Sequence, residues 1–311
     1  MSLEPTTQAF IDSVSGPPLN QLDPTSAHKV LTDLQSQPVA LQDARVEDTV
    51  WPVGPTGQTR IRIVRPANAA PADTLPLIMY FHGGGWVLGD KVTHDRLVRE
   101  LANGVGAAVV FVDYVNAPEA KYPTQQEQAY ASMVYAVEHA NELNVDPSRL
   151  AIVGDSVGGH MAAVVTLLAK QRSGPKIRHQ VLFYPLVDYL SNNESYRKFA
   201  NGPWLTAANM KWMFDLEGLN GKETDVSTWP ARASIEDLRG LPDATIIVDD
   251  DILRDEGEAY ARKLSDAGVR VTSVKYNGTV HDFVMLNPLA DTPAVRGAIA
   301  QAIGALKEAL A

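Results

Sequence analysis

Cysteine is absent from the 311 residues of this sequence. Without a thiol, the chain has no disulfide, no thiolate ligand for zinc or for an iron–sulfur cluster, and no cysteine nucleophile. Any covalent catalysis must therefore use another nucleophilic side chain.

Long hydrophobic runs are also missing. The N-terminal residues MSLEPTTQAF are polar and acidic, with no apolar stretch of signal-peptide length. The apolar stretch at 162–168 is far shorter than the ~20 residues that span a bilayer. We therefore expect a soluble, cytoplasmic protein with no membrane partner.

Basic residues are outnumbered by acidic ones. Lysine and arginine together count 27 against 37 for aspartate and glutamate, which gives a net charge of −10. Nucleic acids and anionic membranes need a basic surface, so neither is expected as a partner. Hydrophobic residues make up 45% and charged residues 21%, which is typical of a soluble globular protein rather than a disordered one.

Apolar, strand-like runs alternate with helical patterns along most of the chain. The predicted strands lie at 58–64, 75–81, 107–112, 150–153, 180–184, 245–248 and 269–276. The predicted helices lie at 125–143, 156–170, 255–267 and from 294 to the C-terminus. This alternation indicates an α/β fold, with a mostly parallel sheet covered by helices on both faces.

Two segments do not follow the alternation. Residues 1–45 contain short helical fragments broken by proline and glycine, and residues 190–238 are polar and irregular but hold several aromatic side chains. Long insertions in compact folds are often functional. We expect both segments to form a lid over a core made of residues 46–189 and 239–311. The alternative is that 190–238 is a passive surface excursion.

The motif Gly-Asp-Ser-Val-Gly at 154–158 has the form G-x-S-x-G and lies directly between a predicted buried strand and a helix. In that context the tight turn strains the backbone of Ser156 and presents its hydroxyl above the end of the sheet. We interpret Ser156 as the candidate nucleophile. The alternative is a glycine turn that merely contains a serine.

Three consecutive glycines follow another predicted buried strand, in the motif HGGGW at 82–86. Backbone N–H groups of such a loop can point at an anion, and the tetrahedral intermediate of acyl transfer needs such donors. A flexible loop or a phosphate cradle is the alternative, but neither nucleotide-binding glycine pattern is present here. We interpret His82 as structural, holding the loop by hydrogen bonds.

A nucleophilic serine needs a base, and the base needs an orienting acid. In folds with this type of turn, the order along the chain is serine, acid, histidine, which leaves His160, His179 and His281. His160 lies in the first turn of the helix after Ser156, and His179 precedes a strand at the wrong end of the sheet. His281 follows the last predicted strand by a short loop, so we expect it beside Ser156.

Three adjacent aspartates at 249–251 follow the preceding strand, where the acid should lie. Spacing alone does not choose among them. Negative charge is also favourable at the start of the next helix, so one or two of them could serve there. Adjacent acids can bind a divalent metal too, but no second cluster of ligands is evident. We therefore expect no metal and no cofactor.

Five motifs, in this order, resemble those of the hormone-sensitive-lipase-like esterases. They are HGGGW at 82–86, VDYVNAPEAKYP at 112–123, GDSVGG at 154–159, DILRDEG at 251–257 and YNGTVHDF at 276–283. The resemblance runs from about residue 61 to the C-terminus. It implies an α/β-hydrolase fold, and it places a helical cap in the two irregular segments.

The resemblance also assigns roles. The family's acid begins a segment like DILRDEG, which selects Asp251 among the three aspartates. Ser156 is then implied as the nucleophile and His281 as the base. No cofactor is implied.

Oxyanion donors implied by the resemblance are the N–H groups of Gly83, Gly84 and Val157. Val157 stands where alanine is usual, and its larger side chain would narrow the acyl pocket. His160 stands where asparagine is common. Asp282 stands where glycine often follows the base, and a carboxylate there would raise the pKa of that histidine.

The implied activity is that of a carboxylesterase, which hydrolyses small, soluble esters with short acyl chains through an acyl-serine. Candidates for the walls of the substrate pocket are Trp86, Tyr184, Trp204 and Trp212. Three alternatives stay open: acyl transfer to alcohols or peroxide, hydrolysis of amides or lactones, and a non-catalytic protein that binds a small ligand. The family often dimerises, so a homodimer is possible.

Overall fold

The computed structural model describes residues 2–189, 192–221 and 228–311. Residues 190–191 and 222–227 of the predicted insertion lie outside the described residues. The strands are β1 (Ala44–Trp51), β2 (Thr59–Pro66), β3 (Leu75–Phe81), β4 (Ala108–Asp113), β5 (Val145–Asp155), β6 (His179–Phe183), β7 (Asp243–Val248) and β8 (Val271–Lys275). The α-helices are α1 (Pro5–Ser13), α2 (Pro24–Gln35), α3 (Asp95–Val105), α4 (Thr124–Glu138), α5 (Val157–Gln171), α6 (Glu194–Lys198), α7 (Ala207–Glu217), α8 (Ile235–Leu238), α9 (Arg254–Asp266) and α10 (Pro293–Leu310).

All of these strands join one sheet, in the order β1-β2-β4-β3-β5-β6-β7-β8. From β4 to β8 every neighbouring pair is parallel, whereas β1 runs antiparallel to β2, and β2 antiparallel to β4. The prediction of an α/β class with a mostly parallel sheet is confirmed.

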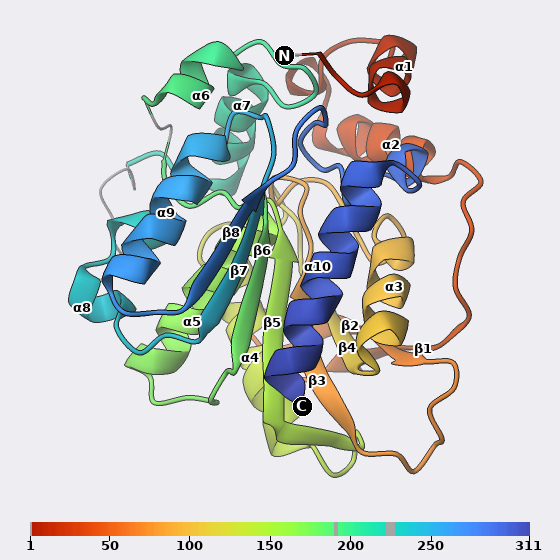
Figure 1. Ribbon diagram of the computed structural model, residues 1–311, viewed down its shortest axis with the longest axis vertical. Helices are drawn as coiled ribbons and strands as arrows, with labels where there is room; N and C mark the ends of the chain where they lie inside the picture. Colours follow the sequence, from red (N-terminus) through yellow and green to blue (C-terminus); the bar gives the residue numbers. More distant parts are fainter. Residues whose placement is uncertain (1, 190–191, 222–227) are drawn as a thin grey trace.

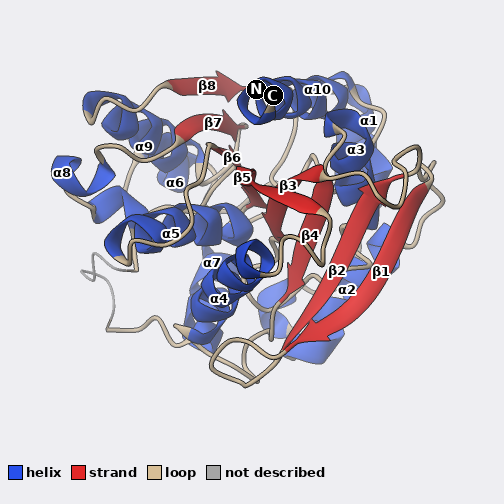
Figure 2. Cartoon of the chain, turned by 90° about the horizontal axis from the view of Figure 1, so that it is seen from below, coloured by secondary structure: helices blue, strands red, loops and turns tan. Residues whose placement is uncertain are grey.

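Helices cover both faces of the sheet. In Figure 2, α4, α5 and α9 lie on one face, and α3 and α10 lie on the other. Each face has its own buried hydrophobic cluster, because the central strands are apolar on both sides. The whole of β4 is buried, and β3 is buried except at Pro76.

Two elements of the α/β core, β1 and α3, were not predicted from the sequence. The edge strand β1 is mostly exposed or half-buried, so it lacks the apolar run that identifies a strand. The helix α3 buries charged residues, including Arg96 and Glu100, on its inner side. Arg96 donates to Glu100 and to the carbonyl of Val284, so a polar residue faces the interior where apolar periodicity would be expected.

Most α-helices of the two segments outside the α/β alternation gather at one end of the sheet. The exception is α8 of the insertion, which lies beside the end of α5. Figure 1 shows α1 and α2 from the N-terminal segment, and α6 and α7 from the insertion, at the upper end of the strands. This is the end at which the parallel strands finish, where ligands bind in open α/β sheets. In the part of the chain that is described, no helix combines the length and apolar character needed to cross a membrane.

Candidate active site

Ser156 occupies the sharp turn between β5 and α5. Its backbone has φ 55° and ψ −120°, which is strained for a residue with a Cβ. The flanking glycines permit the turn: a Cβ at Gly154 would overlap the carbonyl of Gly158, and one at Gly158 would overlap the carbonyl of Phe81. The turn thus raises the serine hydroxyl at the end of β5, as the G-x-S-x-G motif predicts.

Ser156, His281 and Asp251 form one hydrogen-bonded chain. His281 Nε2 lies 2.8 Å from Ser156 Oγ, and His281 Nδ1 lies 2.5 Å from Asp251 Oδ2. All three side chains are buried, and Asp251 Oδ1 also accepts a bond from the N–H of Leu253 at 2.9 Å. The carboxylate therefore fixes the imidazole with its other nitrogen toward the serine, which is the arrangement that activates a hydroxyl nucleophile.

The neighbouring aspartates have other surroundings. Asp250 lies 3.3 Å from Lys275 and 3.7 Å from Arg254, and so forms ion pairs. Asp249 is fully buried, and neither of its oxygens has a hydrogen-bond partner among the described residues. Burial and the nearby Asp251 carboxylate raise the pKa of Asp249 well above its usual range. Of the three, Asp251 is the one that contacts His281.

These groups also form a candidate metal cluster. Asp249, Asp251 and His281 offer ligand atoms within 4.8 Å of one another. The nitrogens of His281, however, already face Asp251 and Ser156. A bound cation would have to compete with the hydrogen bond that orients the imidazole, so the proximity is accounted for by that bond.

The loop after β3 requires one correction to the predicted oxyanion donors. The N–H of Gly83 donates to Asp155 Oδ1 at 3.1 Å, so it is not free to bind an oxyanion. Gly84 and Gly85 line the cavity beside Ser156 and Val157, whereas Gly83 does not. Gly83 is therefore removed from the predicted donors, and Gly84 and Gly85 are the loop glycines that adjoin the cavity.

Asp155 was missed as a functional residue. It is completely buried and also accepts from Tyr80 Oη at 2.7 Å, while His94 Nε2 lies 3.2 Å away. With its bond to Gly83, the carboxylate ties the serine turn to the glycine loop. The only sequence signal for this residue was its position directly before Ser156 in G-x-S-x-G. That position does not predict a hydrogen bond to a loop 72 residues away.

His82 holds the glycine loop, as expected. Its Nδ1 lies 2.8 Å from the carbonyl oxygen of Gly83, and its ring stacks on Tyr114 with a centroid distance of 4.0 Å. Burial and the neighbouring His94 lower the pKa of His82 to about 4, so the ring is neutral at physiological pH.

A cavity of about 310 Å³ opens onto Ser156 and His281. Residues between 11 and 34 form one wall, and residues between 204 and 213 form another. Most of these side chains are apolar, and Ser156, His281 and Asp282 also line the cavity. The two predicted cap segments thus bound the space that a substrate would enter.

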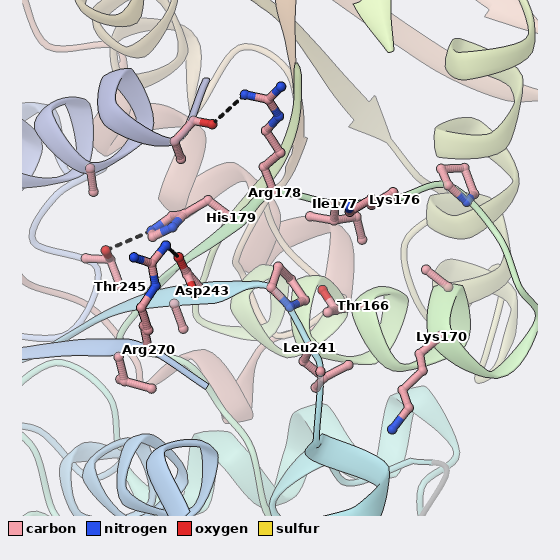
Figure 3. Close-up of a pocket in the computed structure, with 18 of the residues that line it drawn as sticks. Thr166, Lys170, Lys176, Ile177, Arg178, His179, Leu241, Asp243, Thr245 and Arg270 are labelled. Carbon is pink, nitrogen blue, oxygen red and sulfur yellow. Dashed lines mark hydrogen bonds and ion pairs between the residues drawn. The ribbon is translucent and has the colours of Figure 1, made fainter. Parts of the chain in front are cut away.

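A second hollow, of about 890 Å³, lies where strands β6, β7 and β8 begin (Figure 3). Several of its charged groups are engaged within the protein: Arg270 pairs with Asp243, and Arg178 donates to backbone carbonyls of the C-terminal helix. His179 Nε2 lies 2.9 Å from Thr245 Oγ1 and has no hydrogen-bonded carboxylate among the described residues. His179 therefore lies far from Ser156, at the other end of the sheet.

Comparison with known proteins agrees with this geometry. A family model described as the α/β hydrolase fold matches residues 78–285. The carboxylesterase NlhH of Mycobacterium tuberculosis is 36% identical over 285 residues, covering 90% of this chain and 88% of the relative. An ethyl acetate hydrolase of Pseudomonas putida is 34% identical over 233 residues, covering 74% and 73%.

Among solved structures, a thermostable esterase from Pseudomonas putida ECU1011 superposes with a TM-score of 0.96 at 46% identity, covering 100% of this chain and 98% of that one. The chain belongs to the α/β-hydrolase-fold family. The resemblance to its hormone-sensitive-lipase-like esterases is confirmed, and the protein is a hydrolase of carboxylic esters.

Of the four aromatic residues predicted to form walls of the substrate pocket of this esterase, one lines the cavity and three do not. Trp204 lines the cavity. The prediction is wrong for the others, because Trp86 is buried against the rings of the core, Tyr184 packs on His281 at 4.8 Å between ring centroids, and Trp212 packs against the second hydrophobic cluster. These side chains are large enough to fill core space, and their apolar character alone does not distinguish a wall from a core.

Carboxylates set the charge of His281 in the esterase. Burial disfavours the imidazolium, but the charge of Asp282 and the hydrogen bond to Asp251 outweigh it and raise the pKa of His281 to about 9. This agrees with the expectation for a carboxylate after the histidine.

The remaining departures from the family pattern lie close by. Val157 lines the cavity beside Ser156. His160 is fully buried with its ring edge-on to Trp86 and Trp229, and burial lowers its pKa to about 3. His160 is therefore a neutral core residue of the esterase.

Proposed function

We propose that the esterase hydrolyses small carboxylic esters with short acyl chains through an acyl-serine formed on Ser156. The observation that carries this proposal is the hydrogen-bonded chain from Ser156 through His281 to Asp251, of which Ser156 and His281 line the 310 Å³ cavity. Residues 1–45 and 190–238 act as the cap over that cavity.

In the first half-reaction, Ser156 Oγ attacks the ester carbonyl while His281 Nε2 accepts the hydroxyl proton. Asp251 stabilises the imidazolium through the bond to Nδ1. The N–H groups of Gly84, Gly85 and Val157 hold the negative oxygen of the tetrahedral intermediate. His281 then donates the proton to the departing alcohol as the carbon–oxygen bond breaks.

In the second half-reaction, water takes the place of the alcohol. His281 accepts a proton from the water as its oxygen attacks the acyl carbon, and returns the proton to Ser156 Oγ when the carboxylic acid leaves. The same groups thus act twice with reversed direction of proton transfer.

Short acyl chains are supported by the size of the cavity and by the position of Val157. A branched side chain next to the nucleophile reduces the room for the acyl group. The relative named as an ethyl acetate hydrolase supports the same substrate class.

The test of the nucleophile is Ser156→Ala assayed on phenyl acetate. We expect kcat/KM to fall by about 10⁴-fold or more, because the oxyanion donors and binding alone remain. Ser265→Ala, an exposed helical serine, is the matched control and should keep full activity. Labelling of wild type but not of Ser156→Ala by a fluorophosphonate supports the proposal. Retention of most of the activity in Ser156→Ala contradicts it.

The acyl preference is tested with a series of 4-nitrophenyl esters from acetate to octanoate. Wild type should favour the shorter chains, and Val157→Ala should shift the preference toward longer ones. If Val157→Ala has the same chain-length preference as wild type, the Val157 side chain does not limit the length of the acyl chain.

A further inference from the structure

Asp282 makes two contacts that the proposed reaction does not require. Its Oδ2 accepts a hydrogen bond from Trp204 Nε1 at 2.9 Å, and its Oδ1 lies 3.5 Å from His281 Nε2. This is the same nitrogen that faces Ser156. One carboxylate therefore touches both the predicted cap and the imidazole that moves the proton.

Three parts of the chain meet at this point. Trp204 belongs to the segment between β6 and β7, and its ring packs on Phe10 of α1 with a centroid distance of 5.3 Å. Asp282 follows β8 in the core. The hydrogen bond from the indole thus links the core directly to the insertion, and the ring packing extends this contact to the N-terminal segment.

The charge of Asp282 also faces the substrate. Its side chain keeps 18% of its surface exposed and lines the cavity together with Trp204. Of the side chains that line this cavity among the described residues, His281 is the only basic one. A negatively charged group on an ester would meet a fixed carboxylate there, with no lysine or arginine to compensate.

We propose that Asp282 is a positioning and specificity residue, which fixes Trp204 as a wall of the cavity, favours the imidazolium of His281 and disfavours esters that carry a negative charge. The inference rests on the proposed function. It identifies the substrates as neutral or cationic esters.

Burial raises the pKa of Asp282, whereas the charge of His281 and the hydrogen bond from Trp204 favour its carboxylate form. His281 and His94 are the nearby groups whose positive forms it would stabilise, and Asp155, Asp249 and Asp251 are the carboxylates that lie near the pair. These three carboxylates are buried, and none of them lines the cavity. Asp282 is accordingly the carboxylate that a bound ester meets.

The test uses three aryl acetates of similar shape: 3-acetoxybenzamide, 3-acetoxybenzoate and 3-(trimethylammonio)phenyl acetate. Each kcat/KM is divided by the rate constant for hydroxide-catalysed hydrolysis of the same ester, which removes differences in the leaving group. Wild type should turn over the neutral and cationic esters at least tenfold better than the anionic one.

Asp282→Asn removes the charge but leaves an amide oxygen that can accept from Trp204. We expect the discrimination against 3-acetoxybenzoate to shrink by about 10–100-fold, as for a like charge removed a few ångströms away. The pH at which kcat/KM reaches half its maximum should fall in the same variant, because the imidazolium loses a stabilising charge. Asp266→Asn, an exposed aspartate at the end of α9, removes the same charge far from the cavity and should change neither readout.

Trp204→Phe separates the two parts of the proposal. It removes the indole donor and keeps the carboxylate, so KM should rise several-fold for all three esters while the charge discrimination stays. The proposal is overturned if Asp282→Asn leaves both the discrimination and the pH profile within twofold of wild type, or if Trp204→Phe leaves KM unchanged. In those cases Ser156→Ala still reports separately on the proposed function.

Discussion

At the scale of single residues, the charge of His281 governs when the esterase can act. A base must be neutral to accept a proton, and the pKa of His281 is raised to about 9 by the surrounding carboxylates. We predict that kcat/KM on a neutral ester rises about tenfold per pH unit below pH 9 and levels off above it. The measurement is a pH profile on phenyl acetate, corrected for spontaneous hydrolysis. A plateau that begins near pH 7 contradicts the prediction.

A second prediction at the scale of single residues concerns Asp249, which keeps a proton in the folded protein and so makes the stability depend on pH. Burial and Asp251 keep its pKa well above the usual 3.8, so the folded protein retains a proton that the unfolded chain releases near pH 4. The free energy of unfolding then falls with rising pH through this group, by up to about 1.4 kcal/mol per pH unit. Asp249→Asn removes this loss, so the variant should gain stability over wild type as the pH rises from 4 to 8.

Urea unfolding followed by tryptophan fluorescence measures this difference at a series of pH values. Asp266→Asn serves as the exposed control and should follow the wild-type curve. If Asp249→Asn is less stable than wild type at pH 8 by as much as at pH 4, then Asp249 does not hold its proton in the folded state.

At the scale of elements, alanine substitutions at two helical glycines, Gly158 and Gly304, test how tightly the turn between β5 and α5 is packed. A Cβ at Gly158 would overlap the backbone carbonyl of Phe81, whereas one at Gly304 in α10 would meet nothing within 4 Å. Gly158→Ala should lower the free energy of unfolding by about 3 kcal/mol and reduce activity, because backbone cannot yield as a side chain can. Gly304→Ala should raise it by about 0.5–1 kcal/mol.

Chemical denaturation of both variants gives the comparison directly. Equal effects of the two substitutions would mean that the turn relaxes around a methyl group. Loss of activity in Gly158→Ala without loss of stability would mean that the added methyl group disturbs the geometry of Ser156 but not the stability of the fold.

Elements with an apolar run between turn residues were predictable from the sequence. The strand predicted at 75–81 coincides with β3, and the helix predicted at 255–267 differs from α9 by one residue at each end. The strand β1 was not predictable, because it pairs through its backbone while most of its side chains stay partly exposed. A buried strand can be recognised by its run of apolar residues, whereas an edge strand that pairs through its backbone has no such run.

The order along the chain was enough to predict which serine and histidine come together, and the family resemblance was needed to select the aspartate. The engagement of Gly83 by Asp155 was not predictable, because a single hydrogen bond between two loops depends on their final positions. The same holds for Trp204, whose place on the cavity follows from contacts with Phe10 and Asp282 rather than from its neighbours in the chain.

At the scale of the whole molecule, Gln35 fastens the N-terminal segment to the core. Its amide donates to the carbonyls of Thr93 and Met285 at 2.6 and 2.8 Å, and accepts from the N–H of Asn287 at 2.8 Å. Gln35→Ala leaves these buried groups unpaired, which should cost about 2–3 kcal/mol of stability. KM should also rise, because α2 forms part of the cavity wall.

The control for this prediction is Gln8→Ala, whose side chain is exposed and bonds only to Asp12 among the described residues. Its stability should stay within about 0.5 kcal/mol of wild type. Thermal unfolding and steady-state kinetics of both variants provide the two readouts. A normal KM in Gln35→Ala would show that α2 keeps its place without these bonds.

The two chain ends lie at opposite ends of the molecule (Figure 1). Close to the N-terminus, the N–H of Glu4 donates to the carbonyl of Gly278 at 2.8 Å, in the loop that carries His281. The C-terminal helix instead ends beside the starts of the strands, where Arg178 holds its last carbonyls. Tethering the enzyme to a solid support through its C-terminus would therefore turn the catalytic opening toward the solution, whereas a fusion at the N-terminus would press on the loop that holds the base.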